Sequence, residues 1–114
     1  MPRRDADLLI EDITAAIRKI EQYTRGQDRE AFLGDEKTID AVVRNLEVIG
    51  EAARQMPGEF VISHPEVPWP RIAGLRNRIV HEYFGLDLDI IWEIIETDLP
   101  ELASRLPLSS VPAA

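Results

Sequence analysis

Residues 38–56, with the sequence TIDAVVRNLEVIGEAARQM, decide the fold class of this chain. Their apolar side chains recur every three or four positions, which is the spacing of one buried face of a helix. This stripe consists of Ile39, Val42, Val43, Leu46, Ile49 and Ala53. The pair Pro57 and Gly58 ends the helix. Gly50 lies in its middle, where glycine costs about 1 kcal/mol relative to alanine. Either the close approach of another helix or a harmless surface position explains it.

The segments before and after this helix follow the same logic. Residues 5–25 carry a second apolar stripe and predict a helix that stops at Gly26, before a short loop through Gly34. Residues 58–70 contain three prolines and predict a connector with at most one short helical piece. Pro70 suits the first position of the helix that follows.

Two more helices are predicted in the second half of the chain. One spans residues 71–84 and stops at Gly85, and the next starts with Asp87 or Asp89 as its cap. That last helix is expected to kink near Asp98, because Pro100 falls inside its apolar pattern.

No alternating apolar pattern indicates a strand. We therefore predict an all-α domain over residues 1–106, built as a four-helix up-down bundle, with a frayed tail at residues 107–114.

Composition limits what the chain can do. Its 114 residues suffice for one core. The absence of cysteine excludes disulfides, iron–sulfur clusters and thiolate zinc sites, and two histidines exclude a multi-histidine metal site within one subunit. Asp5 and Asp7 precede any long apolar run, which argues against a signal peptide, and no stretch is long and apolar enough to span a membrane. We expect a cytoplasmic location.

The net charge of -8 restricts contact with nucleic acid. Phosphate binders usually present a basic face, so any RNA contact here must be local. The segment from Arg71 to Tyr83 offers three arginines against Glu82 alone, a local net charge of +2. An ordinary solvated helix face is the alternative explanation, and charge alone does not decide between them.

Four polar residues in that segment suggest chemistry: Arg76, Asn77, His81 and Tyr83. On one helix, Asn77 and His81 are four positions apart and Arg76 and Tyr83 seven apart, so all four can border one cleft. Arginine keeps its charge, and histidine exchanges protons near pH 7. This combination suits phosphodiester cleavage.

A metal-free cleavage of RNA is the reaction that these side chains favour. His81 acts as the base for the ribose 2′-hydroxyl or as the acid for the leaving 5′-oxygen, while Arg76 holds the phosphate oxygens. Asn77 orients the phosphate or the imidazole. The product is a 2′,3′-cyclic phosphate, and DNA is excluded because the 2′-hydroxyl is the nucleophile. The reaction needs both a base and an acid, and one chain offers only one such histidine. Two chains that meet at a twofold axis would supply two.

Each residue taken singly has a simpler structural explanation. Arg76 fits a surface ion pair with Glu82 or another acid, His81 a half-buried hydrogen-bonded histidine, and Tyr83 a packed ring with a solvated hydroxyl. His64, beside Pro65, is most simply a surface residue.

A family resemblance adds to this interpretation. The run GLRNRIVHEYF at residues 74–84 resembles the Arg-x4-His-x-Tyr signature of the HepT-like branch of the HEPN superfamily. The run at residues 42–53, Pro68–Trp69 and residues 89–92 resemble the same family. The similarity covers about residues 8–106, without departure at the motif positions.

The resemblance implies an all-α homodimer that is a metal-independent endoribonuclease, the toxin of a type VII toxin–antitoxin pair. Its partner would be a minimal nucleotidyltransferase that uses ATP and magnesium to adenylylate Tyr83, while this chain needs no cofactor. Arg76 and His81 carry over as catalytic, and Asn77 as a polar neighbour. Two other hypotheses remain: a catalytically silent subunit that docks a nucleotidyltransferase or nucleotide, and a purely structural helical dimer.

Overall fold

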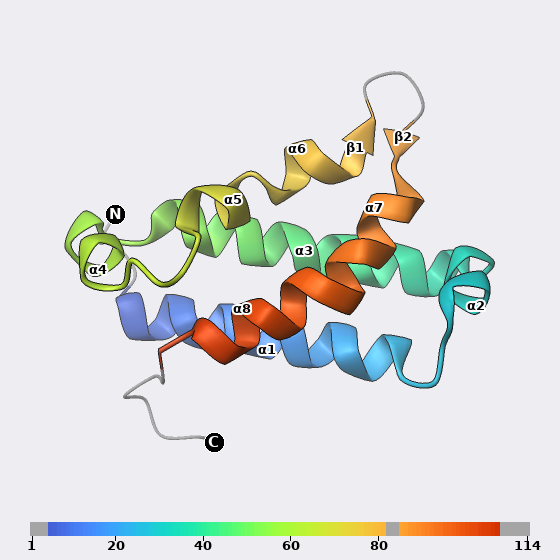
Figure 1. Ribbon diagram of the computed structural model, residues 1–114, viewed down its shortest axis with the longest axis horizontal. Helices are drawn as coiled ribbons and strands as arrows, with labels where there is room; N and C mark the ends of the chain where they lie inside the picture. Colours follow the sequence, from blue (N-terminus) through green and yellow to red (C-terminus); the bar gives the residue numbers. More distant parts are fainter. Residues whose placement is uncertain (1–4, 82–84, 108–114) are drawn as a thin grey trace.

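The computed structural model of the chain describes residues 5–81 and 85–107. The fold class is confirmed, because the described part is mostly helical with almost no strand. The arrangement differs from four plain helices. Two long antiparallel helices, α1 and α3, form one layer, and shorter segments of the second half pack on them (Figure 1).

The two long helices follow the predicted spans. Helix α1 covers Ala6–Thr24 and α3 covers Glu36–Gln55, each within two residues of the expected bounds. The chain leaves α1 through Gly26, whose φ of 78° is the left-handed conformation that glycine adopts without strain. Asp35 caps α3, since its side chain accepts a hydrogen bond from the backbone N–H of Thr38 at 3.1 Å.

The predicted loop between them is wrong, because it contains a short helix, α2 (Arg29–Leu33). The Asp28 carboxylate caps this helix by accepting from the N–H of Ala31 at 2.8 Å. Phe32 is fully buried and its ring lies 5.3 Å from that of Trp92. An ion pair between Arg29 and Asp89 joins the same two segments at the surface.

Residues 56–70 lead the chain from α3 to residues 71–84, which are called the motif segment here. Helix α4 (Gly58–Ser63) is followed by turns and then by α5 (Trp69–Ala73), which has Pro70 in its first turn. The indole N–H of Trp69 donates to the carbonyl of His64 at 3.0 Å and so closes the turn between the two helices.

The predicted helix over residues 71–84 is also wrong. Helix α5 ends at Ala73, α6 covers only Leu75–Ile79, and the strand β1 (Val80–His81) pairs antiparallel with β2 (Gly85–Leu86). The β-branched Val80 is extended at φ −101° and ψ 119°, a conformation that β-branched residues favour. The Ile79 carbonyl accepts from the N–H of Asp87 at 2.7 Å instead of continuing a helix, and Gly85 has a φ of 78°. Residues 82–84 lie outside the described part.

The last helix begins as predicted, with Asp87 as its cap, and changes its winding where a kink was expected. Helix α7 (Leu88–Glu93) passes into a π-helical turn, η1 (Ile94–Asp98), and then into α8 (Leu99–Arg105). Pro100 lies in the first turn of α8 and has no N–H to donate, so the ladder must shift before it. The turn η1 accommodates that shift without breaking the helix. Of the tail predicted at residues 107–114, only Pro107 is described.

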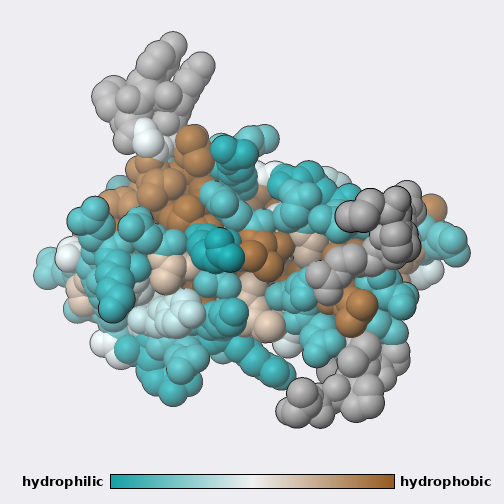
Figure 2. Space-filling model, turned by 180° about the vertical axis from the view of Figure 1, so that it is seen from behind, coloured by the Kyte–Doolittle hydropathy of each residue, from teal (hydrophilic) through white to brown (hydrophobic). Residues whose placement is uncertain are grey.

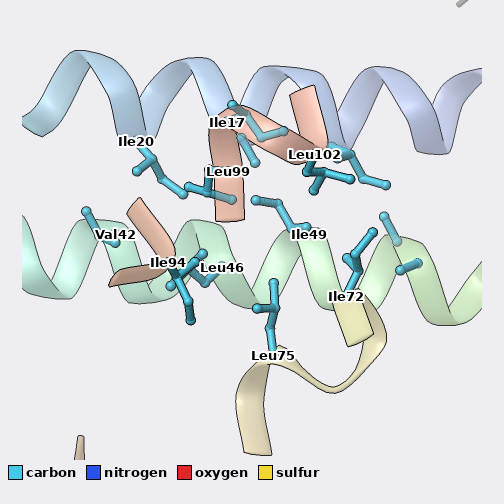
Figure 3. Packing of buried hydrophobic residues seen from close by; sticks show 14 of the residues in the cluster. Ile17, Ile20, Val42, Leu46, Ile49, Ile72, Leu75, Ile94, Leu99 and Leu102 are labelled. Atoms are coloured by element: carbon cyan, nitrogen blue, oxygen red, sulfur yellow. The ribbon is translucent and has the colours of Figure 1, made fainter. Parts of the chain in front are cut away.

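One hydrophobic cluster connects all of these segments. In Figure 3 side chains from α1, α3 and α8 converge, and Ile94, Ile72 and Leu75 of the second half reach the same region. Gly50 is explained by close approach: a Cβ there would lie 3.3 Å from the carbonyl oxygen of Ile72. This contact sets how closely α5 approaches α3, and hence where α6 and its motif begin.

Candidate active site

The motif segment contains a short break between α5 and α6. The N–H of Gly74 donates to the Pro70 carbonyl at 3.0 Å, and α6 restarts at Leu75. Leu75 and Ile79 point into the core, so the same short helix leaves Arg76 and Asn77 exposed.

The three arginines of the segment have different environments. Arg71 and Arg78 both donate to Oδ2 of Asp98, at 3.1 and 2.7 Å. The Asp98 side chain is only 18% exposed, so these bonds tie the motif segment to the end of η1. Arg76 forms no ion pair with any residue in the described ranges 5–81 and 85–107. Arg76 is therefore the arginine of this segment that can take an anionic ligand.

Arg76 borders an open groove of about 420 Å³ over the solvent face of α3. Arg44, Glu47 and Val48 of α3 line the same groove, and α1 closes it on the far side. Hence a phosphate held by Arg76 would lie at the rim of a polar hollow and not on a flat surface.

Arg54 also lines this groove and is held by two hydrogen-bond acceptors. Its Nη2 donates to Oε2 of Glu51 at 2.6 Å and its Nη1 to the carbonyl of Ala73 at 2.8 Å. The pKa of Glu51 is lowered, chiefly by the hydrogen bond from Arg54 and next by that from Gln55. Glu51 therefore stays ionised, and Arg54 acts as a clamp between α3 and the end of α5.

His81 occupies the end of β1, where its backbone pairs with Gly85. The prediction that Asn77 and His81 lie on one helical face is wrong, because the helix ends at Ile79. His81 follows Arg76 by five residues, and one extended residue, Val80, separates it from the end of α6. The predicted neighbour relation between Arg76 and Tyr83 lies outside the described residues.

His64 lies at the surface after α4, as predicted, and its neighbours partly cover it. Its side chain is 28% exposed, its ring lies 4.4 Å from that of Phe60, and its Nδ1 is 3.0 Å from Oε1 of Glu66. It follows α4, at the opposite end of the molecule from β1 (Figure 1). His64 therefore cannot assist His81 within the same chain.

Two residues of the site region were missed by the sequence analysis. Asp98 is 20 residues from Arg78, and no local pattern connects them. Arg44 stands in the run at residues 42–53 that carries the family resemblance, but only the folded chain places it in one groove with Arg76.

Fold and site together define a mostly helical protein that presents Arg76 beside an open polar groove, with His81 five residues further along the same short motif. The family model described as "Ribonuclease HepT-like" matches residues 13–107. The chain thus belongs to the HepT-like ribonuclease family.

Individual relatives are similar over most of their length. A protein of Thermococcus cleftensis named probable ribonuclease HepT is 44% identical over 105 residues, which cover 92% of this chain and 94% of the relative. A putative RNase of Methanocaldococcus jannaschii is 40% identical over 100 residues, covering 88% and 83%. A putative RNase of Caldanaerobacter subterraneus is 44% identical over 85 residues, covering 75% and 76%. No solved structure matches the chain significantly.

The described residues 5–81 and 85–107 form neither a metal-binding cluster nor a helix that could span a membrane. No three histidine or acidic side chains gather there in a way that could hold a metal ion. Within the same ranges, no helix combines the length and the apolar character needed to cross a bilayer.

Proposed function

We propose that this chain is an endoribonuclease that acts as the toxin of a toxin–antitoxin pair, with Arg76 and His81 as its catalytic residues. The observation that carries the proposal is the state of Arg76: it is exposed and free of ion pairs among the described residues, while Arg71 and Arg78 are held by Asp98. Membership of the HepT-like ribonuclease family and relatives named as RNases support the same assignment.

The reaction requires no metal ion in this proposal. The 2′-oxygen of a ribose bonds to the adjacent phosphorus, the bond to the 5′-oxygen breaks, and a 2′,3′-cyclic phosphate remains. His81 takes the proton of the 2′-hydroxyl or gives one to the leaving 5′-oxygen. The guanidinium of Arg76 stabilises the charge that develops on the non-bridging oxygens. Exposed Asn77 is the adjacent polar group that orients the phosphate.

Two copies of the chain complete the site in this proposal. One chain provides His81 alone, because His64 lies at the far end, so a twofold partner must supply the second proton carrier. Val80 of β1 is 44% exposed, and Figure 2 shows hydrophobic surface gathered beside the grey atoms at upper left, near the hairpin. Apolar surface next to a polar motif is typical of an interface.

A minimal nucleotidyltransferase is the proposed antitoxin. Using ATP and magnesium of its own, it would attach AMP to the hydroxyl of Tyr83. The added phosphate is negative and bulky, and it would compete with RNA for the guanidinium of Arg76. Tyr83 is thus the proposed off-switch of the site.

Cleavage of RNA in EDTA tests the catalytic assignment. Purified, unmodified protein should leave 2′,3′-cyclic phosphate ends, and His81→Ala and Arg76→Ala should lower the rate by at least about a hundredfold. Arg18→Ala is the matched control, since Arg18 is exposed on α1 and does not line the groove. Equal cleavage by His81→Ala and the wild type would refute the assignment, and no cleavage by the wild type would favour a silent binding subunit.

The chain offers its own control for the modification. It contains two tyrosines, and Tyr23 on α1 is 41% exposed. Co-expression with the cognate nucleotidyltransferase should add one or more AMP masses to the wild type and to Tyr23→Phe, but not to Tyr83→Phe, as read by intact mass spectrometry. Addition to Tyr83→Phe would contradict the proposal.

A further inference from the structure

A second hollow adjoins the groove beside Arg76. It has a volume of about 260 Å³ and lies between α1 and α3. Asp12, Arg44 and Val48 line both hollows, so they form one continuous surface. This surface, called the seam here, crosses α3 from Arg76 on α6 to Tyr23 on α1.

Basic side chains are spaced along the seam. Lys19 lines the second hollow, Arg44 lines both, and Arg76 lines the first. All three are exposed, and none forms an ion pair within the described residues 5–81 and 85–107. Neighbouring helices lie about 8–10 Å apart, so the three cations span a distance that a few nucleotides of single-stranded RNA bridge.

The seam differs from the rest of the molecule in its charge. Four basic residues line the two hollows against three acidic ones, whereas the whole chain has a net charge of -8. Of the acidic residues, Glu51 is neutralised by Arg54, and Asp12 is engaged in an interaction of its own. Glu47 is exposed and is the acidic group that would repel a phosphate most directly.

Tyr23 adds a stacking surface at the far end. Its ring is 41% exposed and lines the second hollow together with Lys19. A row of cations beside an exposed aromatic ring is the combination by which proteins hold single-stranded RNA, because the cations bind phosphates and every base stacks on a ring.

We propose that the seam binds the single-stranded RNA that flanks the cleavage position. Arg44 and Lys19 bind successive phosphates beyond the one held by Arg76, and Tyr23 stacks on a base at the end of the track. This inference rests on the proposed ribonuclease function and extends it to residues outside the motif.

Binding of an uncleavable RNA tests the seam without involving catalysis. The probe is a short fluorescent single-stranded RNA with methylated 2′-hydroxyls, and anisotropy is measured over a range of salt concentrations with the full chain. Arg44→Gln and Lys19→Gln should each weaken binding roughly fivefold and reduce the slope of log K against log salt by about 0.7.

Two other variants should behave differently. Tyr23→Leu should weaken binding roughly fivefold and leave the salt slope unchanged, because stacking releases no counterion. Glu47→Gln should strengthen binding, since it removes a repelling charge. The matched control is Arg18→Gln, one residue before Lys19 on α1, exposed and outside both hollows. It loses the same charge as Lys19→Gln and should change affinity much less.

Three results would overturn the inference. The first is that Arg44→Gln and Arg18→Gln bind RNA equally well. The second is that Arg44→Gln changes the oligomeric state in sedimentation but not the RNA affinity, which makes the seam a contact between copies. The third is that Arg44→Gln loses only the binding of the nucleotidyltransferase, which makes the seam a surface for a protein partner.

The two proposals fail separately. A wild type that cleaves RNA while the seam variants bind normally refutes the seam alone. A wild type that binds through the seam and cleaves nothing refutes the ribonuclease function alone.

Discussion

Replacing Gly50 by alanine tests the closest contact between α3 and the motif segment. The new Cβ would lie 3.3 Å from the Ile72 carbonyl oxygen and 3.7 Å from that of Ala73. The first distance is shorter than normal Cβ contacts, so α5 must retreat by a few tenths of an ångström. The carbonyl of Ala73 is also held by Arg54 at 2.8 Å, which opposes that retreat.

Whether Gly50→Ala stabilises or destabilises the protein depends on two opposing free-energy contributions. Alanine gains about 1 kcal/mol over glycine in the middle of a helix. Overpacking against a fixed neighbour costs about 1–3 kcal/mol. We expect Gly50→Ala to lower the free energy of unfolding by about 1 kcal/mol, which is about 4 °C in Tm for a domain of this size. Gly50→Val adds two methyl groups beyond the alanine Cβ at the same place and should cost about 3 kcal/mol or more.

Gly58→Ala is the matched control. Gly58 begins α4, and a Cβ there would meet no atom within 4 Å. Its replacement should stabilise the protein by about 0.4–1 kcal/mol, because the unfolded chain loses conformational freedom. Urea unfolding followed by far-ultraviolet circular dichroism measures both variants. If Gly50→Ala raises the midpoint as Gly58→Ala does, the contact does not constrain α5 and the reasoning is wrong.

Other predictions concern the charged residues. Arg78→Gln should lower the free energy of unfolding by about 1–2 kcal/mol, because Arg78 and Asp98 are both largely buried and hydrogen-bonded, whereas Arg76→Gln should leave it within about 0.5 kcal/mol. A double-mutant cycle of Arg78→Gln with Asp98→Asn should give a coupling energy of at least about 0.5 kcal/mol in urea unfolding, and a value near zero would exclude the ion pair. Hydrogen bonds to Asp35, first from the Thr38 hydroxyl, then from the Thr38 N–H and from Gln27, lower the pKa of Asp35 from 3.8. A lowered pKa stabilises the fold above the ordinary value, and this contribution is lost as the pH falls through the lower folded-state pKa. The stability difference between the wild type and Asp35→Ala in urea should thus shrink below pH 3.8, and a difference that does not change with pH would contradict this.

The long helices were predictable because each carries a complete pattern. The stripe of α3 covers about four turns, and Pro57 and Gly58 follow the end of the helix closely, so period and stop signals agree. Helix α2 has only five residues, too few for a period to be visible, and its one local signal was the capping Asp28.

The motif segment could not be predicted from its own residues. Nothing in residues 71–84 shows that the Ile79 carbonyl accepts from the N–H of Asp87 and so ends α6. Likewise, the spacing to His81 singled out Arg76, but no local pattern showed that Arg78 is held by Asp98, a partner 20 residues away. The secondary structure and the ion pairs of short polar segments depend on such distant contacts, and neither the composition nor the hydrophobic periodicity of the segment reveals them.

The same distribution of partners answers the objection that so acidic a chain should not bind RNA. Three of the arginines in and around the motif segment are engaged in ion pairs: Arg71 and Arg78 share Asp98, and Arg54 of α3 pairs with Glu51. These pairs fix α5 and α6 against the rest of the fold, and the cations left without an ion pair in the described residues near the motif, Arg76 and Arg44, lie in one groove. Affinity for phosphate depends on the local charge within about 8–10 Å at physiological salt, not on the sum over the molecule. A net charge of -8 therefore limits where RNA can bind without preventing cleavage at this groove.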